Sequence, residues 1–140
     1  MDRDRIEDLQ TYLAARPDLG IASVYLFGSR AAGRPHRESD IDLAALLRWE
    51  RHPTRRDRFE ARVRLGSELI HVLRFNAVDL VILNDVPPLF GRSIVTTGER
   101  IFLGDSAADH AFVRDVQLRA ADLAPFLRRM AKIKLAALAR

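Results

Sequence analysis

The sequence has no cysteine and very little lysine, since only Lys132 and Lys134 among its 23 basic residues are not arginine. Without cysteine, the chain can form neither disulfides nor thiolate metal sites. It also has no apolar run near the roughly 20 residues that a membrane-spanning helix needs. Its first residues, MDRDRIEDLQ, are charged from the second position onward, unlike a secretory signal peptide. These absences predict a cytoplasmic protein with no membrane partner.

What is present is the composition of an ordinary globular domain: 140 residues, 48% apolar and 30% charged. Basic side chains gather in two stretches, seven against three acids in residues 48–64 and seven against two in residues 114–140. Such stretches bind nucleic acid, phosphates or acidic proteins in some proteins and are simply solvated in others. We therefore do not expect direct binding of nucleic acid, although the two basic stretches are compatible with it.

Alternating helix and strand patterns run through the chain and predict one α/β domain over residues 1–140. The expected strands lie at residues 21–27, 39–47, 77–83 and 100–103. The expected helices lie at residues 4–15, 55–74, 87–98 and 107–139.

Two of these helices carry further expectations. The apolar residues that repeat every three or four positions in the second helix, and are expected to face the core, are Phe59, Val63, Gly66, Ile70 and Leu73. The arginines of residues 48–64 are then expected on its solvated side. In the last helix, Pro125 predicts a kink or a break, because proline has no N–H to donate.

Three aspartates lie in or beside apolar strands, where an unpaired carboxylate is costly to bury. Asp40 and Asp42 flank Ile41, and Asp79 interrupts the apolar AVDLVIL of a later strand. Because side chains alternate along a strand, Asp40 and Asp42 share a face, and Asp79 joins them if the two strands are neighbours. Three anions so close need cations, and Mg²⁺ suits carboxylate and phosphate oxygens. There are alternatives to a metal site: Asp40 is also compatible with an acid at the edge of a strand, and Asp79 with the ion-pair partner of an arginine.

The Gly28-Ser29 pair ends the first strand at a turn that is typical of phosphate-binding loops. Gly28 permits close approach of the backbone, Ser29 adds a hydroxyl donor, and Arg30 is a candidate phosphate ligand as well as a candidate solvated residue. A triphosphate on this turn would have its α-phosphate near Asp40 and Asp42. Two Mg²⁺ ions there would stabilise the attacking and leaving oxygens of a displacement at phosphorus.

These residues also carry a family resemblance. The segment GSRAAGRPHRESDID fits the G-S-x10-D-x-D signature of the DNA-polymerase-β-like nucleotidyltransferases, and Asp79 fits their third acid on a later strand. The chain most resembles the minimal nucleotidyltransferase (MNT) group, over a core of about residues 20–104. The resemblance implies a polymerase-β-like fold, a small mixed sheet flanked by helices with a C-terminal helix at about 107–139.

The same resemblance implies a function. MNT proteins pair with HEPN proteins, small helical RNases, in toxin–antitoxin modules. It implies an antitoxin that uses ATP and two Mg²⁺ ions to attach AMP to a tyrosine of its toxin, with Asp40, Asp42 and Asp79 as metal ligands and catalytic residues. Gly28, Ser29 and Arg30 would bind the nucleotide. The resemblance is also compatible with a homo-oligomer of this protein and with a hetero-oligomer that contains the toxin. An antitoxin that only masks its toxin, and a nucleotidyltransferase for RNA or a small molecule, stay open as alternatives.

The end of the chain, FLRRMAKIKLAALAR, combines basic residues with apolar ones on more than one side of a helix. Such a helix end is poorly suited to free solvent. We expect the apolar stripe of the last helix to pack on the sheet at least as far as Pro125. Beyond Pro125, the sequence is compatible with a core segment and with a protein-binding surface.

Overall fold

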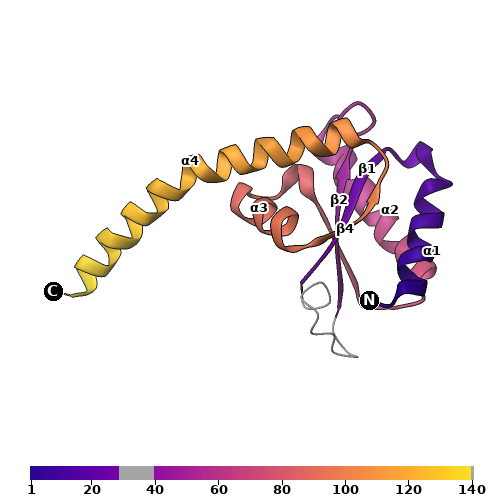
Figure 1. Cartoon of the computed structure of the whole chain (residues 1–140), viewed down its shortest axis with the longest axis horizontal. Coiled ribbons are helices and arrows are strands. Elements are labelled where there is room, and N and C mark those ends of the chain that lie inside the picture. Colours follow the sequence, from indigo (N-terminus) through magenta and orange to yellow (C-terminus); the bar gives the residue numbers. More distant parts are fainter. Residues whose placement is uncertain (29–39, 140) are drawn as a thin grey trace.

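The computed structural model describes residues 1–28 and 40–139. Its centre is a four-stranded mixed sheet in the order β3-β2-β1-β4. Figure 1 labels three of these strands, β1, β2 and β4, beside the helices that flank them. The strands are β1 (Ile21–Phe27), β2 (Ile41–Leu47), β3 (Val78–Ile82) and β4 (Glu99–Leu103). β1 pairs antiparallel with β2 and β4, and β2 pairs in parallel with β3. The predicted small mixed sheet flanked by helices is confirmed.

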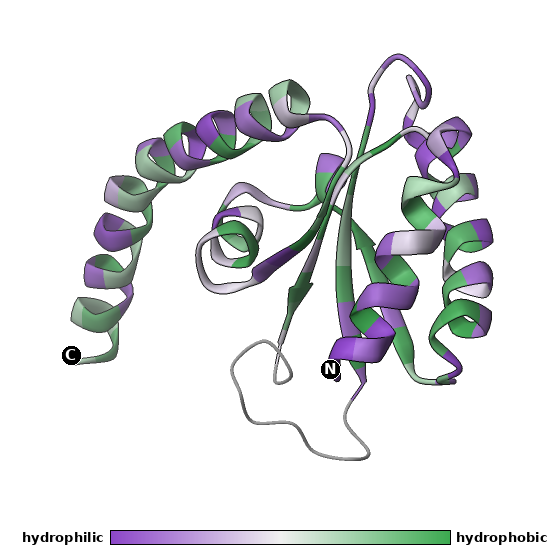
Figure 2. Cartoon of the chain, turned by 45° about the vertical axis from the view of Figure 1, so that its right-hand side comes forward, coloured by the Kyte–Doolittle hydropathy of each residue, from purple (hydrophilic) through white to green (hydrophobic). Residues whose placement is uncertain are grey.

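Helices cover both faces of this sheet. They are α1 (Arg3–Ala14), α2 (Arg55–Leu73), α3 (Pro88–Thr97) and α4 (Ser106–Leu138), with short 3-10 helices η1 (Pro17–Leu19) and η2 (Leu83–Asp85). α1 and α2 pack on one face, and α3 with the first part of α4 packs on the other (Figure 2). The alternation of β2 serves both sides, because Leu43 belongs to the α1–α2 core whereas Ala44 and Leu46 belong to the α3–α4 core.

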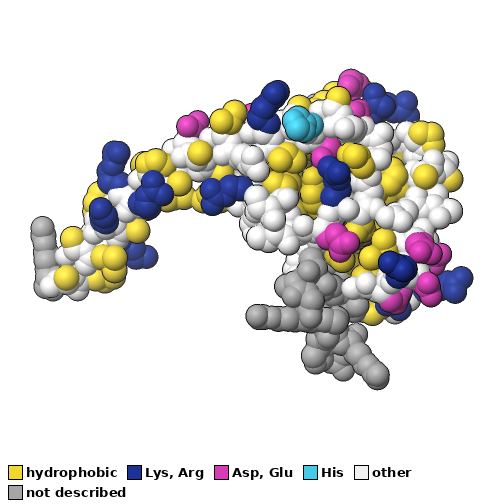
Figure 3. All heavy atoms as spheres, in the orientation of Figure 1, with side chains coloured by type: hydrophobic (Ala, Val, Ile, Leu, Met, Phe, Trp, Pro, Cys, Tyr) yellow, Lys and Arg dark blue, Asp and Glu magenta, His cyan; other side chains and the backbone are white. Residues whose placement is uncertain are grey.

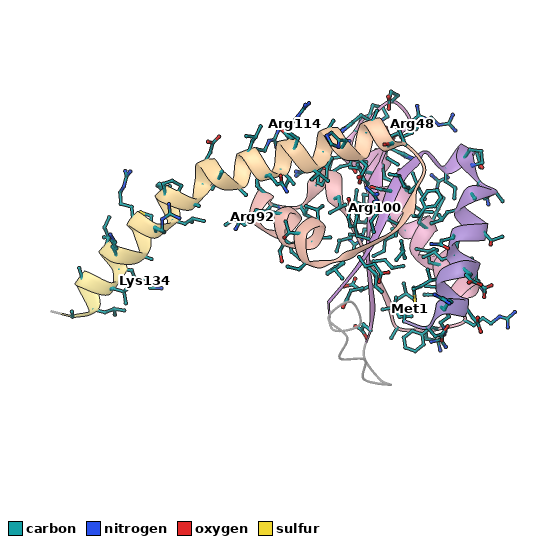
Figure 4. All side chains as sticks on the ribbon, in the orientation of Figure 1. Met1, Arg48, Arg92, Arg100, Arg114 and Lys134 are labelled. Carbon is teal, nitrogen blue, oxygen red and sulfur yellow. The ribbon has the colours of Figure 1, made fainter. Side chains whose placement is uncertain are left out.

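The first turns of α4 are fixed to the sheet by a buried acid. Asp109 is 2% exposed and accepts a hydrogen bond of 2.8 Å from the Tyr25 hydroxyl of β1. Its other oxygen forms an ion pair of 3.0 Å with Arg100 of β4, which lies between α4 and the sheet in Figure 4. Burial and the bond to Asp109 raise the pKa of Tyr25. One carboxylate thus joins α4 to two strands.

The expected core-facing side of α2 is wrong by about one residue over the first half of the helix, whereas Leu73 near its end is buried as expected. The helix begins at the predicted capping box of Thr54 and Asp57. Its buried residues are Arg58, Ala61, Leu65, Leu69 and Leu73. Phe59 and Val63, which were expected in the core, are 59% and 58% exposed.

Two boundaries also differ from expectation. β2 begins at Ile41 rather than at residue 39, so Asp40 precedes the strand. α4 runs without a break through Pro125, and the ribbon curves gradually instead of ending there (Figure 1). Of the predicted kink or break at Pro125, the break is therefore wrong. The missing N–H leaves only one carbonyl without its partner, which is tolerable where the helix is exposed to water.

Packing of α4 on the domain ends about one turn before Pro125, earlier than expected, since Leu123 is already 37% exposed. Val116 and Ala120 are buried, whereas residues 125–139 are all exposed. This second half projects away from the sheet (Figures 1 and 2). Within the described chain it is therefore not core. Among residues 1–28 and 40–139, no helix is long and apolar enough to cross a membrane.

Candidate active site

One row of side chains crosses three strands at one end of the sheet. Phe27 of β1 is the antiparallel partner of Asp42 in β2, and Asp42 is the parallel partner of Asp79 in β3. Partners in register point to the same face and lie within side-chain contact range. The expectation that the strands of Asp42 and Asp79 are neighbours therefore holds, and their face is the one that carries α3.

Gly28 lies directly behind the Asp42 carboxylate. Its φ is +77°, in the left-handed region that glycine adopts without strain. A Cβ atom at this position would overlap Oδ2 of Asp42 and approach its Cγ to 3.1 Å. Glycine is thus required at position 28 for two reasons: the backbone turn has a positive φ, and the Asp42 carboxylate occupies the space that a side chain would need.

The three acids influence one another. Burial raises the pKa of Asp42 above its usual value, and the charges of Asp79 and Asp40 raise it further. Asp42 is half-buried, while Asp79 and Asp40 are exposed. A partly desolvated carboxylate beside two like charges is typical of functional sites and favours the binding of a cation.

Carboxylate oxygens at this position fit Mg²⁺, which takes one or two protein carboxylates and completes its shell with water and phosphate. Asp42 and Asp79 provide such a pair, and Asp40 adds a third acid at the start of β2. In residues 1–28 and 40–139, no group of three or more acidic or histidine side chains is arranged so that it could hold a metal ion. Metal binding by these three residues therefore stays a prediction.

The two sides of the row differ. On the β1 side, the ring of Phe27 meets Phe90 of α3 edge-to-face, with 5.8 Å between the ring centres. On the β3 side, Asp79 lies on an edge strand and is exposed. The row is therefore closed by aromatic rings on one side and open on the other.

Some predicted site residues cannot be placed. Ser29 and Arg30 lie outside the described residues, so their part in nucleotide binding stays a prediction. Conversely, the contact between Phe27 and Phe90 was not predicted. Phe90 lies 63 positions after Phe27, so no local pattern indicates that the two rings meet, and only the packing of α3 on β1 reveals the contact.

A comparison with protein families shows to which family the chain belongs. A family model described as "Polymerase beta, Nucleotidyltransferase" matches residues 7–107, most of the chain. The chain belongs to the polymerase beta nucleotidyltransferase family. The match includes Gly28 and all three aspartates, and the prediction of a nucleotidyltransferase enzyme is confirmed.

Solved structures resemble this nucleotidyltransferase over nearly its whole length. A chain of the MntA–HepT toxin–antitoxin is 20% identical with a TM-score of 0.62, covering 99% of this chain and 100% of that one. A chain of a toxin–antitoxin with AMP-PNP is 23% identical with a TM-score of 0.60, covering 96% and 98%. A third chain belongs to tri-AMPylated Shewanella oneidensis HEPN toxin in complex with MNT antitoxin; it is 21% identical with a TM-score of 0.60, covering 97% and 99%. At these identities the likeness concerns the fold. No curated protein matches.

Proposed function

We propose that this nucleotidyltransferase is the antitoxin of a HEPN–MNT module and transfers AMP from ATP to a tyrosine hydroxyl of its cognate HEPN RNase toxin. The observation that carries the proposal is the in-register pair of Asp42 and Asp79, with Gly28 packed directly behind Asp42. A glycine turn can bind the phosphates of a triphosphate. The paired carboxylates beside it can bind the cation that neutralises those phosphates.

In this proposal, the backbone at Gly28, with Ser29 and Arg30, holds the phosphate chain of ATP. Asp40, Asp42 and Asp79 would hold Mg²⁺, which when bound neutralises their charges and those of the phosphates. The tyrosine oxygen attacks the α-phosphorus, the bond from that phosphorus to the bridging oxygen breaks, and pyrophosphate leaves with the electron pair. A carboxylate oxygen of Asp79 accepts the hydroxyl proton, because Asp79 lies on the open side of the row.

The toxin as acceptor is supported by the neighbours. Three chains of toxin–antitoxin structures align with this one from end to end, including its C-terminal helix, and one of those complexes contains an AMPylated HEPN toxin.

The test is transfer of label. The protein is incubated with α-labelled ATP, Mg²⁺, RNA and its cognate HEPN protein, for which the product of the adjacent gene is the first to test. We expect label on a tyrosine of the HEPN protein, and loss of that label when excess chelator is added. Label on RNA would replace the toxin by a nucleic-acid acceptor, and no label at all would refute an enzymatic antitoxin.

A second candidate, neutralisation by binding alone, is favoured by one observation. The projecting half of α4 exposes the apolar side chains Phe126, Leu127, Met130, Ile133, Leu135 and Leu138. Yellow apolar and dark blue basic spheres occur side by side along it in Figure 3. A stable but unlabelled complex with the HEPN protein in the transfer experiment would support this candidate.

A further inference from the structure

A groove runs between α2 and the outer edge of β3. It consists of two hollows of about 380 and 370 Å³ that share Phe59 and Arg62. We define this α2–β3 groove by the residues Phe59, Arg62, Val63, Gly66 and Ile70 of α2 and by strand β3. Asp79 lines the second hollow. The groove and the row of carboxylates therefore share one residue, the candidate proton acceptor.

The wall that α2 contributes is apolar and uncovered. Phe59 and Val63 lie one helical turn apart and are 59% and 58% exposed. They belong to the repeat that the sequence analysis expected in the core. Large apolar side chains that are grouped on a surface and adjoin a catalytic residue mark a binding site more often than an ordinary surface.

The opposite wall is an edge strand. β3 pairs with β2 on one side only in the described sheet. Leu80 directs its carbonyl outward, where it accepts a hydrogen bond of 2.9 Å from Nε of Arg62. Because Arg62 occupies the middle of this edge, a continuous added strand is blocked. The groove suits a segment that binds mainly through its side chains.

Gly66 keeps the middle of the groove wide. It lies inside α2, where glycine is unfavourable compared with alanine. A Cβ atom added there would meet nothing within 4 Å. No packing inside the domain therefore requires glycine at this position, and the space beside it is open.

The charges of the groove argue against nucleic acid. Asp79 and Asp85 line it, and Asp85 already pairs with Arg58 at 2.9 Å and with Arg55 at 3.8 Å. The remaining cation, Arg62, is bound to the Leu80 carbonyl. Single-stranded nucleic acid is usually bound in a basic groove that follows the phosphates, and these residues do not form one.

We propose that the α2–β3 groove docks the polypeptide segment of the acceptor protein that carries the modified hydroxyl. Apolar side chains of that segment pack on Phe59, Val63 and Ile70. The segment then continues around the exposed edge of β3, so that its hydroxyl residue reaches the Asp79 carboxylate on the sheet face that carries α3. The proposal rests on the proposed function, since it requires a protein acceptor, and adds where that acceptor binds.

The test fills the groove at its open glycine. Gly66→Trp places a large ring in the groove, and Gly66→Ala, which fits there, is the matched control. Transfer is measured against HEPN toxin concentration, and AMP-PNP binding is measured separately by calorimetry. We expect Gly66→Trp to raise the KM for the toxin by about tenfold or more with AMP-PNP affinity unchanged, and Gly66→Ala to behave like the wild type.

A second pair of variants covers the case of a misfolded Gly66→Trp protein. Phe59→Ser with Val63→Ser removes the exposed apolar wall, and Leu103→Ser, 42% exposed on β4 at the other edge of the sheet, is its control. We expect the same rise in KM for the first and none for the second. A wild-type KM in the Gly66→Trp and Phe59→Ser/Val63→Ser proteins, or an equal loss of AMP-PNP affinity, overturns the groove inference. Absence of transfer by the wild type overturns the proposed function instead.

Discussion

Asp42 is held in the site at a cost to the folded state. Burial and the charges of Asp79 and Asp40 raise its pKa above the ordinary value of 3.8. A carboxyl whose pKa is raised by folding destabilises the native protein when it is ionised. That cost is absent below the ordinary pKa, grows as the pH rises through the raised pKa, and is fully present at neutral pH.

Replacing this acid should therefore separate stability from activity. Asp42→Asn keeps the shape and removes the repulsion, so we expect a higher melting temperature at pH 7 and a gain that shrinks as the pH falls toward 4. Transfer should fall by at least about 10³-fold, because the carboxylate is proposed to act in the transition state.

Asp40→Asn is the matched control for the stability effect. It makes the same change of charge at an exposed position, so its gain in melting temperature should be smaller although transfer is also lost. A clear drop in melting temperature for Asp42→Asn would show instead that this acid is part of a stabilising network.

The acids and Gly28 could be predicted from the sequence because their constraints are local. A glycine turn after an apolar strand is typical of phosphate-binding loops, and aspartates inside apolar runs are costly without a cation, so together they point to a site. What the sequence could not give was the register that aligns Phe27, Asp42 and Asp79. That alignment depends on how three strands pair, and the pairing is decided by the whole core.

At the scale of elements, the helix α2 was predicted correctly, but the side of it that is buried was not, and the contacts of Arg58 explain why. Arg58, an arginine expected in solvent, is 6% exposed. Its guanidinium donates to both oxygens of Asp85 at 2.9 and 3.0 Å and lies 4.7 Å from the centre of the Trp49 ring. A paired arginine can occupy a core-facing position because its stem is apolar. Asp85 is 27 positions away, so no local pattern could reveal the pair that turns Phe59 outward.

The attachment of α4 gives an element-scale prediction. Asp109→Ala removes the carboxylate that joins α4 to Tyr25 and Arg100, and leaves the buried hydroxyl without its acceptor. Because Arg100 is partly exposed and can turn to water, we expect a loss of about 2 kcal/mol rather than the full value for a buried pair.

The control lies on the same helix. Asp115 pairs with Arg119 at 3.2 Å on the surface, so Asp115→Ala should change the free energy of unfolding by less than about 0.5 kcal/mol. Urea denaturation of the two variants measures both values. Equal effects would mean that the Asp109 network does not stabilise the attachment of α4.

At the scale of the whole molecule, one apolar stripe serves two purposes along α4. Its members follow a spacing of four and three residues: Val116, Ala120, Leu123, Leu127 and Met130. The first two are buried, whereas Leu127 and Met130 are 42% and 48% exposed. The stripe thus continues beyond the domain that covers its start. The sequence predicted the stripe but left its second half open between core and partner surface, because what covers a helix depends on how far the rest of the fold extends.

We expect this projecting half to hold the toxin and to contribute nothing to folding. Truncation after Ala124 should leave the melting temperature and AMP-PNP binding nearly unchanged, because residues 125–139 are all exposed. It should abolish the stable complex with the HEPN toxin in sedimentation. The basic residues Arg128, Arg129 and Lys132 accompany the stripe, and Lys134 lies on the projecting end in Figure 4, so the partner surface should be apolar with acidic neighbours.

Point variants decide whether the stripe itself makes this contact. Leu127→Ser with Met130→Ser removes two of its side chains, and Leu135→Ser, 66% exposed on another side of the helix, is the matched control. The double variant should weaken toxin binding by about 100-fold, as expected for two truncated anchors in a protein interface, and the control should bind like the wild type. If the truncated protein becomes insoluble, the segment is needed for folding. If it still binds the toxin with full affinity, the toxin is held by another part of the surface, and the α2–β3 groove is the first to test.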